Sequence, residues 1–73
     1  MITQERKDEL TKAGWYIEDM GEEWGPDFAD QYRFMHKHDE DTFGDIQYSM
    51  EDAWDDCCQY QLSLVSIGEM KYI

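Results

Sequence analysis

The chain has 73 residues, with 18 Asp or Glu against six Lys or Arg, and its net charge is −12. A chain of this length holds one small hydrophobic core, so we expect a single domain over residues 1–73. With so few basic residues, the composition argues against direct binding to DNA or RNA. The three Trp, five Tyr and three Phe indicate that the chain folds despite its charge.

The first predicted elements are a helix and a short strand. Thr3 is a good N-cap and Gly14 suits the left-handed position after a helix end, so a helix is predicted from Thr3 to about Ala13. The β-prone residues 15–17 predict a strand. A long acidic loop is expected over about residues 21–30, because glycines and the single proline interrupt regular structure there.

The middle of the chain predicts a hairpin and a second helix. Residues 31–38 alternate in polarity and predict a half-buried strand, followed by a hairpin loop at 38–42 and a shorter strand at about 43–48. Ser49 and Asp52 resemble a capping box for the second helix. The apolar stripe predicted for this helix consists of Met50, Ala53, Trp54 and Cys57.

Residues 62–67 alternate imperfectly and are rich in β-prone side chains, so we favour a final strand, although they would also extend the helical stripe. The expected class is α+β. We predict a small antiparallel sheet of three to four strands with two helices against one face, in the order α-β-β-β-α with a C-terminal strand.

All of the net charge lies between Glu18 and Asp56, where 14 acids face only Arg33 and Lys37. A field concentrated in one sector steers cationic partners and repels nucleic acid, so we interpret the acids as a surface for a basic protein. The alternative is that they merely keep the chain soluble. The predicted partner-binding residues are Glu18, Asp19, Glu22, Glu23, Asp27, Asp30, Asp39, Glu40, Asp41, Asp45, Glu51, Asp52, Asp55 and Asp56.

Two further features refine this interpretation. Four acids of the second helix, opposite its apolar stripe, are expected to matter most: Glu51, Asp52, Asp55 and Asp56. Trp24 and Phe28 stand within the acidic loop and either anchor a partner or belong to the core.

Metal binding has two weak candidates. Residues 39–46 begin like an EF-hand loop, but Phe43 has no ligand oxygen at the fifth position and Met50 replaces the bidentate Glu at the twelfth. His36 and His38 share one face of a strand and could hold zinc with a third ligand. Such pairs more often serve hydrogen bonding, so we predict no cofactor and no metal.

No catalytic motif is present in the sequence, and we predict a non-enzymatic protein. Cys57 and Cys58 are adjacent, so at most one faces the core of a helical protein, and neither belongs to a two-residue-spaced redox or zinc motif. The N-terminal residues lack an apolar targeting segment, and no apolar run is long enough to span a bilayer. We therefore expect a cytoplasmic location and no association with membranes.

Short length, high acidity and the lack of a catalytic motif together resemble the DNA-mimicking inhibitors of phages and mobile elements, which include anti-CRISPR and anti-restriction proteins. The resemblance is one of overall type, without a shared motif. It implies a phage-encoded inhibitor that blocks the nucleic-acid-binding groove of a basic DNA- or RNA-binding protein or complex of the host's defence. The alternative is an acidic interaction module or small regulatory subunit that docks a basic partner unrelated to DNA.

Overall fold

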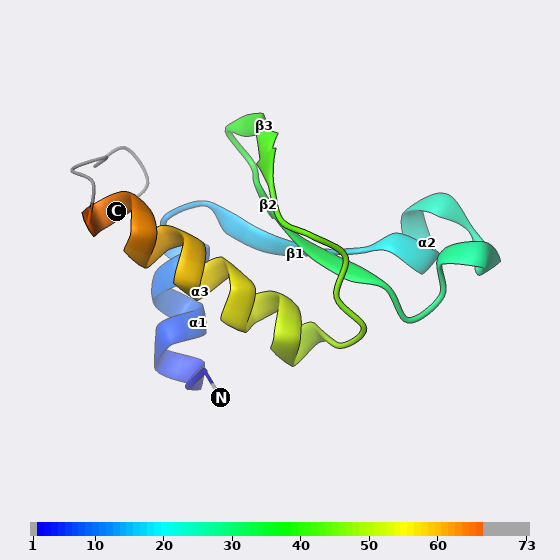
Figure 1. The fold of residues 1–73 in the computed structure, drawn as a ribbon, viewed down its shortest axis with the longest axis horizontal. Coiled ribbons are helices and arrows are strands. Elements are labelled where there is room, and N and C mark those ends of the chain that lie inside the picture. Colours follow the sequence, from blue (N-terminus) through cyan, green and yellow to red (C-terminus); the bar gives the residue numbers. More distant parts are fainter. Residues whose placement is uncertain (1, 67–73) are drawn as a thin grey trace.

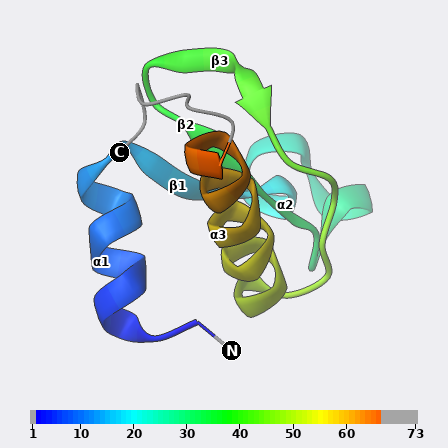
Figure 2. The same ribbon diagram turned by 60° about the vertical axis from the view of Figure 1, so that its left-hand side comes forward.

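The computed structural model describes residues 2–66, which form a three-stranded antiparallel sheet with two long helices on one face (Figure 1). The turned view shows helix α3 crossing in front of the sheet with α1 beside it (Figure 2). The strands are β1 (Trp15–Asp19), β2 (Tyr32–His36) and β3 (Asp39–Phe43), in the spatial order β1-β2-β3. The helices are α1 (Gln4–Lys12), the short α2 (Met20–Trp24) and α3 (Met50–Ser66), with a 3₁₀ turn, η1, at Pro26–Phe28. The predicted α+β class is confirmed.

Helix α1 begins and ends where the sequence predicts. Thr3 Oγ1 accepts a hydrogen bond from the backbone N–H of Arg6 at 3.1 Å, satisfying an amide that a helix start leaves unpaired. After the helix, Gly14 adopts a φ of +108°. A Cβ on Gly14 would lie 2.7 Å from Nε2 of His36, so backbone conformation and close approach both require glycine.

The core lies between the sheet and the two long helices. Trp15 of β1 and Phe34 of β2 are 1% and 2% exposed, and their rings meet edge to face with centroids 5.5 Å apart. Leu10 of α1 and Cys57 of α3 complete this buried cluster. Because the residues of this cluster come from α1, β1, β2 and α3, the small core depends on all four elements at once.

The expected loop at 21–30 is partly helical. Asp19 is the N-cap of α2, since its Oδ1 accepts hydrogen bonds from the amides of Gly21 at 3.1 Å and Glu22 at 3.3 Å. The prediction took the glycines of this segment as interruptions of regular structure, and therefore missed the cap at Asp19. The turn η1 then returns the chain to β2, with the amide of Met20 bonded to the carbonyl of Gln31 at 2.9 Å.

The hairpin is shifted relative to its prediction. The chain turns at Lys37 and His38, so the residues from Asp39 to Asp41 lie in strand β3 and the predicted loop at 38–42 is wrong. The predicted strand at 43–48 is also wrong beyond Phe43, because residues 44–49 are irregular apart from a bridge between Gln47 and Tyr32. Strand pairing with β2 overrides the low β-propensity of three consecutive acids.

Helix α3 begins at its predicted cap, where Ser49 Oγ accepts a hydrogen bond from the amide of Asp52 at 3.1 Å. It continues through residues 62–66, so the favoured C-terminal strand is wrong there, and residue 67 lies outside the described residues. Met50 was expected in the core but is exposed at the first helical position. The stripe that faces the core consists of Ala53, Cys57 and Gln61, and the predicted Trp54 packs against the core cluster, as does Leu64. Packing of this stripe, at helical spacing, decides the conformation of the last two turns.

Candidate functional site

Eleven of the predicted partner-binding acids fall into three groups; Glu18 and Asp19 precede the first group, and Asp45 lies between the second and the third. The lobe acids, on α2, η1 and the following turn, are Glu22, Glu23, Asp27 and Asp30. The strand acids, on β3, are Asp39, Glu40 and Asp41. The helix acids, on the first two turns of α3, are Glu51, Asp52, Asp55 and Asp56.

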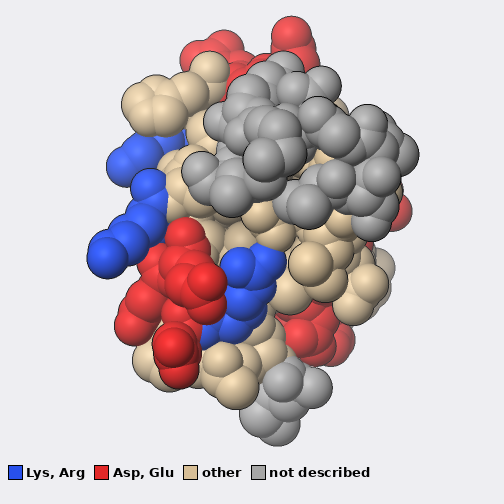
Figure 3. All heavy atoms as spheres, turned by 90° about the vertical axis from the view of Figure 1, so that its left-hand side faces the viewer, with Lys and Arg blue, Asp and Glu red and all other residues tan. Residues whose placement is uncertain are grey.

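The three groups occupy different parts of the molecule. The short helix α2 lies at one end of the long axis, the β2–β3 hairpin projects from the top of the view, and α3 begins below the sheet (Figure 1). The opposite end, on the left of that view, presents Lys and Arg side chains next to Asp and Glu (Figure 3). The structure therefore divides the expected single acidic surface into three patches.

Eight of the fourteen acids are exposed to solvent. They include all four lobe acids, two strand acids and one helix acid: Glu22, Glu23, Asp27, Asp30, Glu40, Asp41, Asp45 and Asp52. The exposed acids can therefore meet a partner without rearrangement of the fold.

Two of the predicted acids are neutralised within the protein. Glu18 accepts a hydrogen bond from Nε of Arg33 at 2.8 Å, and both side chains are mostly covered, with 15% and 19% exposed. Glu51 forms a salt bridge with Nζ of Lys7 at 2.6 Å, which ties the start of α3 to α1. Because each carboxylate already has a cationic partner, neither adds much to the outward field.

Asp56 also acts inside the fold. Burial, and secondarily repulsion from Asp45, raises the pKa of its carboxyl group, whereas hydrogen bonds from the Gln47 side chain and the Asp45 backbone oppose this shift. Asp56 therefore lies where the irregular segment 44–47 meets α3. Among the helix acids, Asp52 is therefore the one best placed to meet a partner, with Asp55 half-buried beside it.

The strand acids lie on an edge of the sheet. Asp39 accepts hydrogen bonds from the Asp41 amide at 3.1 Å and from Oγ1 of Thr42 at 2.8 Å, so it shapes the strand. Glu40 and Asp41 are exposed. Charges on an edge strand also prevent pairing with other chains, so this group has a structural role alongside any binding role.

The lobe carries two aromatic side chains that are not part of the core. Trp24 is 60% exposed and Phe28 is 37% exposed, with ring centroids 6.3 Å apart. They stand among the lobe acids, where an aromatic face can receive a cationic side chain. Their anchoring role stays a prediction.

The sequence reasoning missed other exposed apolar side chains, and those on β1, on β3 and between β3 and the start of α3 are Tyr16, Phe43, Ile46, Tyr48 and Met50. The alternation of β1 contained part of the signal, since a buried Trp15 places Tyr16 on the opposite face. Exposed aromatic and methionine side chains are enriched in protein interfaces, so these residues are candidates for partner contact.

The histidine pair has structural contacts. His36 is buried, its Nε2 donates to the carbonyl of Ala13 at 2.8 Å, and its Nδ1 accepts from the amide of His38 at 3.2 Å. Since a backbone amide can only donate, this arrangement needs the Nε2–H tautomer. Within residues 2–66 no three His, Cys, Asp or Glu side chains are grouped so as to hold a metal ion.

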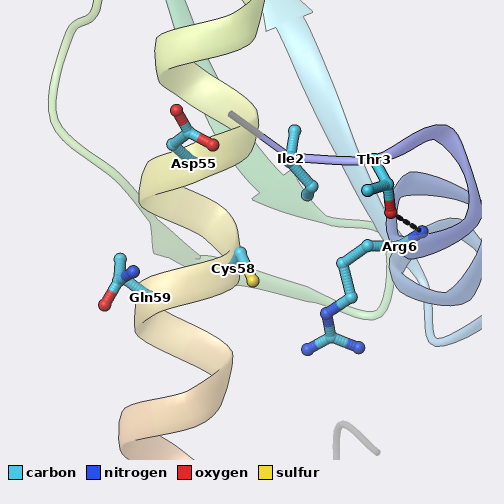
Figure 4. Close-up of a pocket in the computed structure, with 6 residues that line it drawn as sticks. All are labelled: Ile2, Thr3, Arg6, Asp55, Cys58 and Gln59. Atoms are coloured by element: carbon cyan, nitrogen blue, oxygen red, sulfur yellow. Dashed lines mark hydrogen bonds between the residues drawn. The ribbon is translucent and has the colours of Figure 1, made fainter.

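The cysteines differ in environment. Burial raises the pKa of the Cys57 thiol to about 12. Cys58 lines a pocket of about 360 Å³ between the start of α1 and α3, together with Ile2, Thr3, Arg6, Asp55 and Gln59 (Figure 4). The guanidinium of Arg6 is already held by Gln61 and, at 3.6 Å, by Glu9, so the pocket's cationic group is satisfied internally.

Comparison with known proteins found no matching family model, no matching curated protein and no matching solved structure. None of the helices described has both the length and the apolar character that crossing a membrane requires.

Proposed function

We propose that this chain is a non-enzymatic inhibitor that occupies the basic nucleic-acid-binding groove of a host defence complex, such as a CRISPR-Cas complex, in place of DNA. The exposure of eight acids of the central block carries the proposal, because these carboxylates can meet the Lys and Arg of a basic groove directly. Most of the charge of −12 is thereby presented to solvent.

The amount of charge is suited to this role. The long axis of the molecule is 39 Å, and a duplex of that length carries about 23 phosphate charges at one per ~1.7 Å. A groove that contacts one side of a duplex meets about half of them. The eight exposed acids of the central block supply most of that number, distributed over the three patches.

The spacing of the acids also supports mimicry. Successive residues of an extended strand rise about 3.4 Å, which equals the axial rise per nucleotide of one DNA strand. Because successive side chains point to opposite faces, the acids of β3 that share a face are Asp39 and Asp41, about 6.8 Å apart or two nucleotide rises. On α3, the exposed Asp52 and the half-buried Asp55 are three residues apart, about 4.5 Å along the helix axis. Lys and Arg placed for phosphates can thus reach carboxylates instead.

A second candidate is an interaction module that docks a basic partner unrelated to DNA. The exposed Trp24 and Phe28 favour it, because aromatic anchors contribute to protein interfaces and have no counterpart in a row of phosphates. Both candidates require a basic partner, and they differ in whether DNA competes for the same surface.

The test is inhibition of target-DNA binding by a panel of purified CRISPR effector complexes and restriction enzymes, read by fluorescence anisotropy of labelled duplex. We expect the chain to release DNA from at least one member, and excess unlabelled DNA to displace the chain. Removing two exposed charges should weaken inhibition by about three- to tenfold, given up to ~1 kcal/mol per exposed charge pair. The variants are Glu22→Gln with Glu23→Gln for the lobe, and Glu40→Gln with Asp41→Asn for β3.

The matched control removes two exposed acids of α1, by Glu5→Gln with Asp8→Asn, and changes the net charge equally. Equal losses in control and test variants would mean that total charge, rather than the central block, is recognised. A basic partner that binds this chain and DNA simultaneously would refute mimicry and favour the interaction module. If the unmodified chain inhibits DNA binding by no member of the panel, the result counts against the proposal.

A further inference from the structure

The face of the sheet opposite α3 carries an apolar row that no described element covers. Trp15 and Phe34 point into the core, so their strand neighbours Tyr16 and Met35 lie on the outer face. Tyr16 pairs with Met35, and Met35 pairs with Phe43. The row therefore crosses all three strands, with Phe43 51% and Tyr16 41% exposed.

The charges next to this row cancel each other. Glu18 and Arg33 are cross-strand partners on the same face and are joined at 2.8 Å. The Arg33 guanidinium also lies 4.8 Å from the centroid of the Phe43 ring, so it packs flat between a carboxylate and an aromatic face. The outer face thus combines three apolar side chains with an internally neutralised ion pair.

Exposed acids stand at the margins of this face. Strand β1 leads directly into α2 with Glu22 and Glu23, and β3 carries Glu40 and Asp41 along the sheet edge. An apolar centre with a charged rim is the usual anatomy of a protein interface. Three strands of five residues span only about 14 by 17 Å, below the ~800 Å² that each partner buries in a standard interface. A stable interface here must therefore also bury the charged residues at the margins of the sheet.

We propose that the outer face of the sheet is the centre of a docking surface for a basic protein, whose apolar side chains cover Tyr16, Met35 and Phe43 while its Lys and Arg meet the acids of the rim. The sign of the partner's charge rests on the proposed function. A second copy of the chain is a poor occupant, because two molecules each with a charge of −12 repel one another.

The test uses two synthetic peptides as probes, each with six arginines, which alternate with leucine in one and with serine in the other. Binding to the full chain is measured by calorimetry at physiological salt. We expect the leucine peptide to bind more tightly than the serine peptide. The double substitution Tyr16→Thr with Phe43→Thr should reduce this ratio of affinities about tenfold, because it truncates two anchoring side chains. Affinity for the serine peptide should not change.

The control variant is Leu62→Gln, which removes a comparably exposed apolar side chain from α3, on the other side of the sheet. It should leave both affinities unchanged. Amide chemical-shift mapping on the unmodified chain provides a second readout that requires no variant, and the leucine peptide should shift the amides of Tyr16, Met35 and Phe43 most.

The outcomes separate the two proposals. Equal binding of both peptides, or shifts confined to another surface, would overturn this inference while leaving the proposed function intact. Failure of both peptides to bind at low salt would remove the premise of a basic partner and count against the proposed function itself. Self-association through Tyr16 and Phe43, detected by sedimentation, would assign the face to a second copy and overturn the inference.

Discussion

Substitution of Gly44 by alanine tests how closely the segment after β3 packs on the core. The Gly44 amide donates to the carbonyl of Phe34 at 3.0 Å, which brings the two backbones together. A Cβ at this position would overlap the Phe34 ring and lie 2.7 Å from Oδ2 of Asp56. The ring has no room to retreat, because Trp15 and Tyr60 flank it with centroids 5.5 and 5.3 Å away.

The expected cost is a large part of the stability of this domain. Forcing one extra carbon into a packed core costs about 1–3 kcal/mol. At ~0.05–0.15 kcal/mol per residue, a 73-residue domain has about 4–11 kcal/mol in total. With a urea m-value of about 1 kcal/mol/M, Gly44→Ala should lower the unfolding midpoint by about 1–3 M. The unfolding midpoint is measured by tryptophan fluorescence and far-UV circular dichroism in a urea titration.

A double-mutant cycle identifies the cause of the loss. If overlap with the ring is responsible, Gly44→Ala should cost less in a Phe34→Leu background, where a smaller side chain leaves space. An equal cost in both backgrounds would refute the proposed overlap. A midpoint unchanged by Gly44→Ala would show that the segment does not lie against Phe34.

Two further predictions concern titratable side chains. Because burial raises the Cys57 thiol pKa to about 12, a disulfide reagent at pH 8 should modify the half-buried Cys58 first and Cys57 only on unfolding. For Asp56, the raised pKa means that the folded state binds its proton more tightly than the unfolded state does. The destabilisation is therefore absent below the usual aspartate pKa of about 3.9 and complete above the raised pKa. Asp56→Asn should stabilise the protein at pH 7 and lose this advantage at pH 3, measured by urea titration at each pH.

Each of these predictions has a clear contrary result. Equal rates of modification at both thiols in the native protein would contradict the burial of Cys57. A gain from Asp56→Asn that is the same at pH 3 and pH 7, or a loss at pH 7, would show that the hydrogen bonds from Gln47 and the Asp45 backbone outweigh burial. Asp41→Asn, the same substitution at an exposed position, serves as the control.

Local signals in the sequence were sufficient for much of the fold. The cap at Thr3, the glycine after α1 and the cap at Ser49 act through hydrogen bonds between near neighbours, so α1 and the start of α3 were predicted correctly. The alternation around Phe34 likewise identified β2 and its buried face. The acidity of the block from Glu18 to Asp56 is a property of composition and needs no structure.

Other features depend on contacts between distant segments. Residues 62–66 are nearly balanced between strand and helix, and the packing of Leu64 and Gln61 against α1 and the sheet decides for helix. The salt bridges of Glu18 with Arg33 and of Glu51 with Lys7 neutralise two of the fourteen acids in the central block. Residue type alone does not distinguish these two from the other twelve.

The sequence by itself determined the sign and amount of charge, the α+β class and the caps, because these follow from residue type and from neighbours a few positions apart. Only the tertiary structure decided that the acids form three patches and that Tyr16, Met35 and Phe43 form a row across three strands. Strand register and ion pairing join residues far apart in the chain. The pattern of side chains along one segment does not specify which distant segment will pair with it.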